Sequence, residues 1–135
     1  MKRYNLIPTL LLISGLAVLI PAGAQASTAA AGKLPSGKPV TVTILEPGQQ
    51  PRYTFAGTAN ENVTFNVTHF DITAGSGVLP EFTLDFYEPG SSSVYTSCNF
   101  GDNGYCNFTA PVGGTWSIAV IPNFDSGGSF TIKLT

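Results

Sequence analysis

Both cysteines of the chain, Cys98 and Cys106, stand in one short stretch, SCNFGDNGYCN, with seven residues between them. A redox pair would favour the Cys-x-x-Cys spacing near a helix N-terminus, which lowers the thiolate pKa, and this stretch has neither feature. In an exported protein, two cysteines normally pair with each other. If the N-terminus directs export, as its residues indicate, the stretch therefore predicts a structural disulfide.

The residues between the cysteines also include oxygen donors that suit calcium, namely Asp102, Asn103 and the carbonyls around Gly101 and Gly104. Asp-Asn-Gly is equally a common hairpin turn, because Asn and Gly accept a positive φ. We expect no cofactor, and we keep Asp102 and Asn103 as calcium candidates. Zinc is disfavoured, because the sulfurs are expected to be oxidised and the chain has one histidine.

That histidine, His69, could serve as a general base oriented by Asp71, two residues further on. The alternative is a strand-end histidine at the rim of the core, bonded to the adjacent loop. No nucleophile-placing motif such as Gly-x-Ser-x-Gly accompanies it. Three clustered carboxylates, those of Glu81, Asp85 and Glu88, are explained by a solvated strand face. We expect no enzymatic activity, and a small secreted hydrolase using His69 and nearby carboxylates is the alternative.

The N-terminus has the pattern of a secretory signal peptide. Lys2 and Arg3 precede an apolar run over 6–20, and Ala24-Gln25-Ala26 forms a small-x-small cleavage site. The run is too short and interrupted to span a bilayer, which takes about 20 continuous apolar residues. We therefore predict a signal peptide over 1–26, cleavage near Ala26, no membrane span, and a secreted or periplasmic protein.

The chain that follows the signal is acidic and of single-domain size. Residues 27–37 are rich in small residues, Gly and Pro, and predict a flexible leader. Beyond residue 26, four lysines and arginines stand against eight acids, a formal net charge of −4. Such a chain has few cations to neutralise phosphates, so we expect no nucleic-acid partner. We also expect a monomer.

Residues 38–135 alternate between apolar and polar side chains, the pattern of half-buried antiparallel strands. Gly, Pro, Asn and Ser clusters separate the runs and favour turns. About eight strands follow, which predicts an all-β, antiparallel, jelly-roll-like β-sandwich. The inward apolar residues are expected to be Val40, Val42, Ile44, Tyr53, Phe55, Val63, Phe65, Val67, Phe82, Leu84, Phe86, Trp116, Ile118, Val120, Phe130, Ile132 and Leu134.

Strand parity adds a prediction about the cysteine stretch. If 101–103 form a loop, Cys98 lies opposite Cys106 in a hairpin, and the disulfide faces the core. Tyr95 and Tyr105 then point outward, as Tyr87 does on its own strand. Because exposed aromatic rings stack on sugars or apolar side chains, these three tyrosines form the candidate binding face.

Three segments carry a resemblance to a known family. These segments are EPGQQPRYTFAGTANENVTFNVT over 46–68, LDFYEPGSS over 84–92 and APVGGTWSIAVIPNFDSGGSFTIKLT over 110–135. They resemble the strand and turn patterns of bacterial pre-peptidase C-terminal domains, and the last segment is similar to the closing hairpin of that family. The resemblance implies a jelly-roll-like sandwich that assists secretion, solubility or attachment to a polymer, and calcium binding in some relatives. The chain departs from the family in carrying no catalytic domain and in its cysteine stretch.

Together these observations predict a secreted, non-enzymatic binding or accessory module. The partners expected are an extracellular polysaccharide, a protein polymer or a cell surface.

Overall fold

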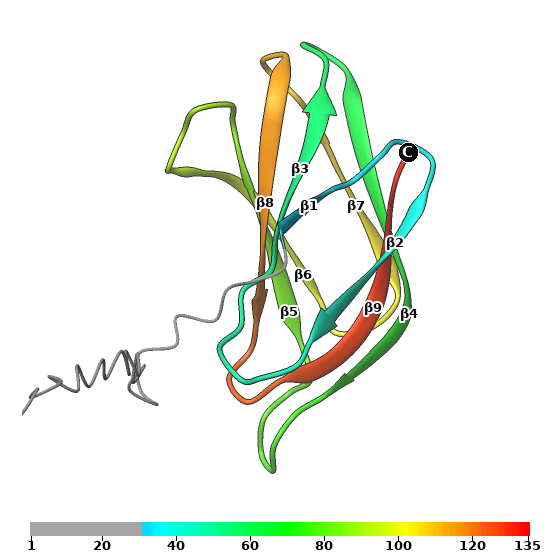
Figure 1. Cartoon of the computed structure of the whole chain (residues 1–135), viewed down its shortest axis with the longest axis vertical. Helices are drawn as coiled ribbons and strands as arrows, with labels where there is room; N and C mark the ends of the chain where they lie inside the picture. The colour runs from blue at the N-terminus through cyan, green and yellow to red at the C-terminus, as the bar shows by residue number, and fades with distance from the viewer. Residues whose placement is uncertain (1–30) are drawn as a thin grey trace, which may run out of the picture.

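Residues 31–135, the part of the chain that the computed structural model describes, form nine strands and no helix. One sheet has the order β1 (Ala31–Lys33), β3 (Arg52–Gly57), β8 (Gly114–Pro122), β5 (Phe82–Tyr87), β6 (Val94–Phe100). The other has the order β2 (Pro39–Ile44), β9 (Gly127–Leu134), β4 (Asn62–Thr73), β7 (Gly104–Thr109). The two sheets face each other (Figure 1), so the predicted all-β sandwich is confirmed.

Accordingly, residues 31–135 hold no helix that could cross a membrane. The predicted signal peptide lies outside the described residues.

Consecutive strands mostly lie in opposite sheets. Only β5 and β6 follow each other within one sheet, and every other connection crosses the sandwich. All pairings are antiparallel except that of β1 with β3. The connections therefore collect at the two ends of the sandwich.

The first strand corrects the prediction of a flexible leader over 27–37. Ala31–Lys33 pair in parallel with β3. Leu34 is buried, and its backbone N–H donates to the carbonyl of Thr54. The alternation of apolar and polar side chains could not reveal this strand, because three residues are too few to show a period of two. Residues 27–30 lie outside the described residues.

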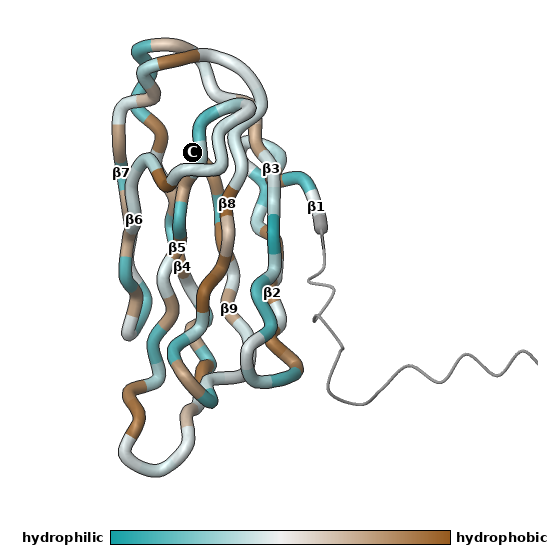
Figure 2. Tube along the Cα trace, turned by 90° about the vertical axis from the view of Figure 1, so that its left-hand side faces the viewer, coloured by the Kyte–Doolittle hydropathy of each residue, from teal (hydrophilic) through white to brown (hydrophobic). Residues whose placement is uncertain are grey.

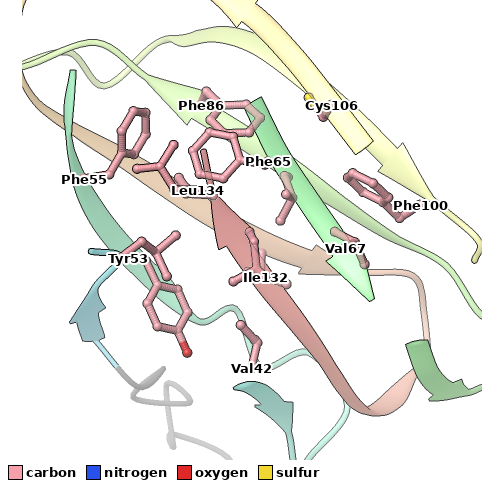
Figure 3. Close-up of a cluster of buried hydrophobic side chains, with 14 of the residues drawn as sticks. Val42, Tyr53, Phe55, Phe65, Val67, Phe86, Phe100, Cys106, Ile132 and Leu134 are labelled. Atoms are coloured by element: carbon pink, nitrogen blue, oxygen red, sulfur yellow. The ribbon is translucent and has the colours of Figure 1, made fainter. Parts of the chain in front are cut away.

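The space between the sheets is filled by aromatic and branched side chains from the inward positions of both sheets. At one end of the sandwich, the rings of Phe65 and Phe86 lie 5.1 Å apart, and Phe55 packs edge-on against Phe65. Figure 3 shows Leu134 beside this group. Toward the other end, Phe82 stacks on Phe130 at 4.0 Å. Each contact joins the two sheets, so the predicted period of two does build one shared core.

The cysteines form the predicted disulfide, with 6.1 Å between their Cα atoms. The predicted hairpin is wrong, because β6 pairs with β5 and β7 pairs with β4. Cys98 and Cys106 project inward from the edge strands of opposite sheets, and Cys106 is buried. The disulfide therefore closes the edge of the sandwich between the two sheets. The closing hairpin that the resemblance implied is corrected in the same way, because β8 and β9 also lie in opposite sheets.

Gly128 marks a close approach between β9 and β4. Its φ is 133°, and a Cβ atom added there would lie 2.0 Å from the carbonyl oxygen of Asp71 on β4. The backbone at Asp71 cannot move away from this Cβ atom without breaking the central pairing of β9 with β4. Only glycine fits at this position.

We expect Gly128→Ala to lower the free energy of unfolding by about 3 kcal/mol or more, because both the clash and the backbone strain act on the native state. Gly77→Ala is the matched control, since Gly77 also has a positive φ of 80° but no atom within 4 Å of the added Cβ. That control should lose only about 1 kcal/mol. Urea denaturation measures both, and equal losses would contradict the close approach.

Removal of the disulfide in the double variant Cys98→Ala/Cys106→Ala should lower the free energy of unfolding by roughly 2.5 kcal/mol, the loop-closure value for this short ring. Urea denaturation of the variant and of the reduced chain should give the same midpoint. A variant as stable as the oxidised chain would show that closing the sheet edge contributes nothing.

Burial raises the pKa of Tyr53 above its usual 10.0, because desolvation disfavours the phenolate. The unfolded chain ionises first, so this contribution to stability is present below about pH 10 and is lost as the pH rises further. Between about pH 9 and about pH 11, the melting temperature should fall more steeply for the parent chain than for Tyr53→Phe. Parallel falls would contradict this assignment.

Candidate functional site

His69 and Asp71 do not form the pair that the hydrolase alternative requires. A bulge between Thr68 and Asp71 interrupts the pairing of β4 with β9, and His69 takes a φ of 50° there. The bulge reverses the parity of the strand, so Phe70 packs inward on Phe82 and His69 is exposed rather than at the core rim. Its Nδ1 lies 3.2 Å from the hydroxyl of Thr68. The acid–base dyad of the hydrolase alternative is therefore not assembled.

Both calcium candidates accept hydrogen bonds from backbone N–H groups. Asn103 Oδ1 accepts a hydrogen bond of 3.0 Å from the N–H of Phe70, which the bulge leaves without a ladder partner. Asp102 Oδ1 accepts one of 2.7 Å from the N–H of Asn103. Across residues 31–135 no group of three or more His, Cys, Asp or Glu side chains is placed to hold a metal. Calcium binding at this loop stays a prediction.

The three candidate tyrosines lie on separate surfaces, which corrects the predicted single face. Tyr105 is 71% exposed on the outer side of β7, in the four-stranded sheet. Tyr95 is the extra residue of a bulge in β6, where Phe86 pairs with Thr96 and Tyr87 with Val94. The bulge brings its ring to 5.4 Å from the ring of the buried Trp116, while Tyr95 stays 43% exposed. Tyr87 lies on the outer side of the five-stranded sheet.

Around Tyr87, mostly polar side chains from neighbouring strands lie in cross-strand rows. One such row runs across β3, β8, β5 and β6 and consists of Arg52, Ala119, Asp85 and Ser97. We call this surface the Tyr87 face, and it comprises Arg52, Glu81, Thr83, Asp85, Tyr87, Ser97 and Asn99.

Hydrogen bonds and a cation–π contact order the Tyr87 face. Ser97 donates to Asp85 at 2.6 Å. Asn99 links two neighbours, accepting from Thr83 at 3.3 Å and donating to Glu81 at 3.3 Å. The Arg52 guanidinium lies 5.6 Å from the centre of the Tyr87 ring. The face thus presents a held aromatic ring beside carboxylate, amide and guanidinium groups.

A second surface lies at one end of the sandwich. Three connections meet there, 45–51, 74–81 and 123–126, at the bottom of Figures 1 and 2. The N–H of Asn123 bonds to the carbonyl of Glu81, and its side chain donates to the carbonyl of Leu79. Each connection exposes one large apolar side chain, with Leu45 78%, Leu79 66% and Phe124 85% exposed. We call these three residues the loop-end patch.

A hollow of about 370 Å³ opens beside Phe124. Pro47 and Gly48 line it from the first connection, and Ile121, Pro122 and Asp125 line it from β8 and the connection that follows. The hollow therefore lies between two of the three connections that carry the patch.

Neither Arg52 nor the loop-end patch was anticipated from the sequence. The available signal was a large apolar residue inside a turn segment, as in Leu45-Glu46-Pro47-Gly48 and Asn123-Phe124-Asp125. Such a residue lies outside the strands, so the alternation of inward and outward positions does not place it in the core. Which turns meet in space depends on the strand order.

Comparison with solved structures shows what this fold is similar to. The pre-peptidase C-terminal domain of a collagenase from Bacillus anthracis matches with a TM-score of 0.59 at 14% identity, over 79% of this chain and 96% of that chain. Two periplasmic inhibitors of g-type lysozyme, PliG from Aeromonas hydrophila and from Salmonella Typhimurium, match with TM-scores of 0.47 each. Their identities are 15% and 13%, over 78% of this chain and 98% and 99% of theirs.

Scans of the sequence against protein-family models and against curated proteins find no match. The similarity to known proteins is thus one of three-dimensional structure. It confirms the resemblance to pre-peptidase C-terminal domains at the level of the fold.

Proposed function

We propose that this chain is a secreted, non-enzymatic module that binds an extracellular polysaccharide through the Tyr87 face. The observation that carries the proposal is the placement of the Tyr87 ring beside hydrogen-bonding side chains on the outer surface of one sheet. Sugar rings stack on aromatic rings, and their hydroxyls bond to carboxylates, amides and guanidinium groups. The face offers all of these within neighbouring rows.

The order of the face supports this function. The bonds of Asp85 with Ser97 and of Asn99 with Glu81 hold the polar groups before a ligand arrives. Side chains that are already held lose less conformational entropy on binding, which favours affinity. The face therefore suits recognition better than an isolated exposed tyrosine such as Tyr105 does.

Two further observations support the cellular setting. A disulfide is typical of proteins that act in an oxidising compartment, outside the cytoplasm. The similar pre-peptidase C-terminal domain belongs to a collagenase, an enzyme named for the polymer collagen. A module that attaches to a polymer fits both observations.

The test is affinity electrophoresis of the purified chain through gels that contain soluble polysaccharides, with collagen and calcium as further additions. Tyr87→Ala should weaken the interaction with the retarding polysaccharide about tenfold, which corresponds to about 1.4 kcal/mol of stacking and packing. Tyr105→Ala is the matched control and should migrate like the parent chain, because Tyr105 lies on the opposite sheet.

A parent chain that no polysaccharide retards would contradict the proposal. So would a Tyr87→Ala variant that is retarded as strongly as the parent.

A further inference from the structure

The loop-end patch repeats one arrangement on three separate connections. Leu45 precedes Glu46, Leu79 lies two residues before Glu81, and Phe124 precedes Asp125. These are the charged residues of the three connections 45–51, 74–81 and 123–126, and all are acidic. An exposed apolar side chain thus stands beside a carboxylate at each of three points.

The carboxylates have no cation of their own. Among residues 31–135, none of the three forms an ion pair with a lysine or arginine. Arg52, the cation closest in sequence to this end, extends over the Tyr87 ring. The lysines at 38 and 133 lie at the far ends of β2 and β9, as the pairing of Pro39 with Lys133 places them. The end of the sandwich therefore presents uncompensated negative charge around apolar side chains.

We propose that the loop-end patch binds a basic polypeptide segment that also carries an apolar side chain. Lys and Arg have apolar stems and cationic heads, so they match a surface on which an apolar group lies next to a carboxylate. The hollow beside Phe124, lined by Pro47, Ile121 and Pro122, accepts the apolar side chain of the same segment. This inference goes beyond the proposed function, because it uses a different surface and a different ligand class.

Two other occupants fit the charges less well. Residues 31–135 of a second copy carry four lysines and arginines against eight acids, a formal net charge of −4, and would bring the same carboxylates to the patch, where like charges repel. An anionic membrane surface is disfavoured for the same reason. A basic segment turns the same charges into attraction.

The test measures the binding of labelled synthetic peptides in which Lys and Arg flank one Leu or Phe, by fluorescence anisotropy with the purified chain. Copies with Glu at the basic positions serve as reference probes. At least one basic peptide should bind at least about tenfold more tightly than its acidic copy, and added salt should weaken its binding. No difference between the two sets would overturn the proposal.

Two double variants locate the binding. Leu79→Ser/Phe124→Ser removes apolar contact, and Glu46→Gln/Asp125→Asn removes charge, with Asn accepted at the φ of 59° that Asp125 has. Each should lose at least about fivefold in affinity for the basic peptide. Glu81 is left unchanged because it also belongs to the Tyr87 face.

The matched controls are Tyr105→Ser for the apolar variant and Glu61→Gln/Glu88→Gln for the charge variant. Tyr105 is a comparably exposed aromatic residue, and Glu61 and Glu88 lie in connections at the opposite end. Both controls should bind the basic peptide like the parent, and all variants should keep the parent's melting temperature. Loss of binding in the controls, or full binding by the patch variants, would overturn the proposal.

Two further measurements separate the proposal from its alternatives. A dimer in sedimentation that Leu79→Ser/Phe124→Ser dissociates, or binding to anionic vesicles that this variant loses, would assign the patch to those occupants instead. Polysaccharide retardation should be unchanged in the patch variants. Failure of the Tyr87 face and failure of the patch are thus distinguishable.

Discussion

The packing of aromatic rings between the sheets is the contact on which the rest of this structure depends. Phe82 lies on Phe130 at 4.0 Å, and Phe65 lies 5.1 Å from Phe86, so each pair joins one strand of either sheet. Rings of this size bury large apolar areas and set how far apart the sheets stand. Every second residue of these strands is thereby committed to the core. The residues between them are left to form the outer surfaces, including the Tyr87 face.

The same requirement explains where the loops lie. A chain that buries one face of each strand between two sheets can alternate between them, and here only the β5–β6 connection stays within a sheet. The connections are thus collected at the two ends, where turns distant in sequence become neighbours. The connections that carry Leu45, Leu79 and Phe124 meet in this way, although about 80 residues separate the first of these residues from the last. The Tyr87 face is rigid sheet surface, whereas the loop-end patch is built on connections, which are common positions for binding residues.

Local irregularities decided most of the differences between the predicted and observed sites. One bulge turned Tyr95 toward Trp116, and another exposed His69 and sent Phe70 inward. A bulge adds one residue to one strand, so it reverses parity for every residue beyond it. Neither bulge has a Gly or Pro at its centre that would mark it in the sequence. The predictions failed at these positions because they assumed an unbroken period of two.

The sequence by itself determined the all-β class, eight of the nine strands, the inward residues of the strand segments that have no bulge, and the pairing of Cys98 with Cys106. These features follow from local alternation, turn residues and cysteine count, which a single chain displays without partners. Strand order, the bridging of two sheets by the disulfide, and the Tyr87 face and loop-end patch were decided only by the tertiary structure. Antiparallel strands of similar pattern can pair in several orders, and only the packing of complementary side chains across the whole core selects one of them.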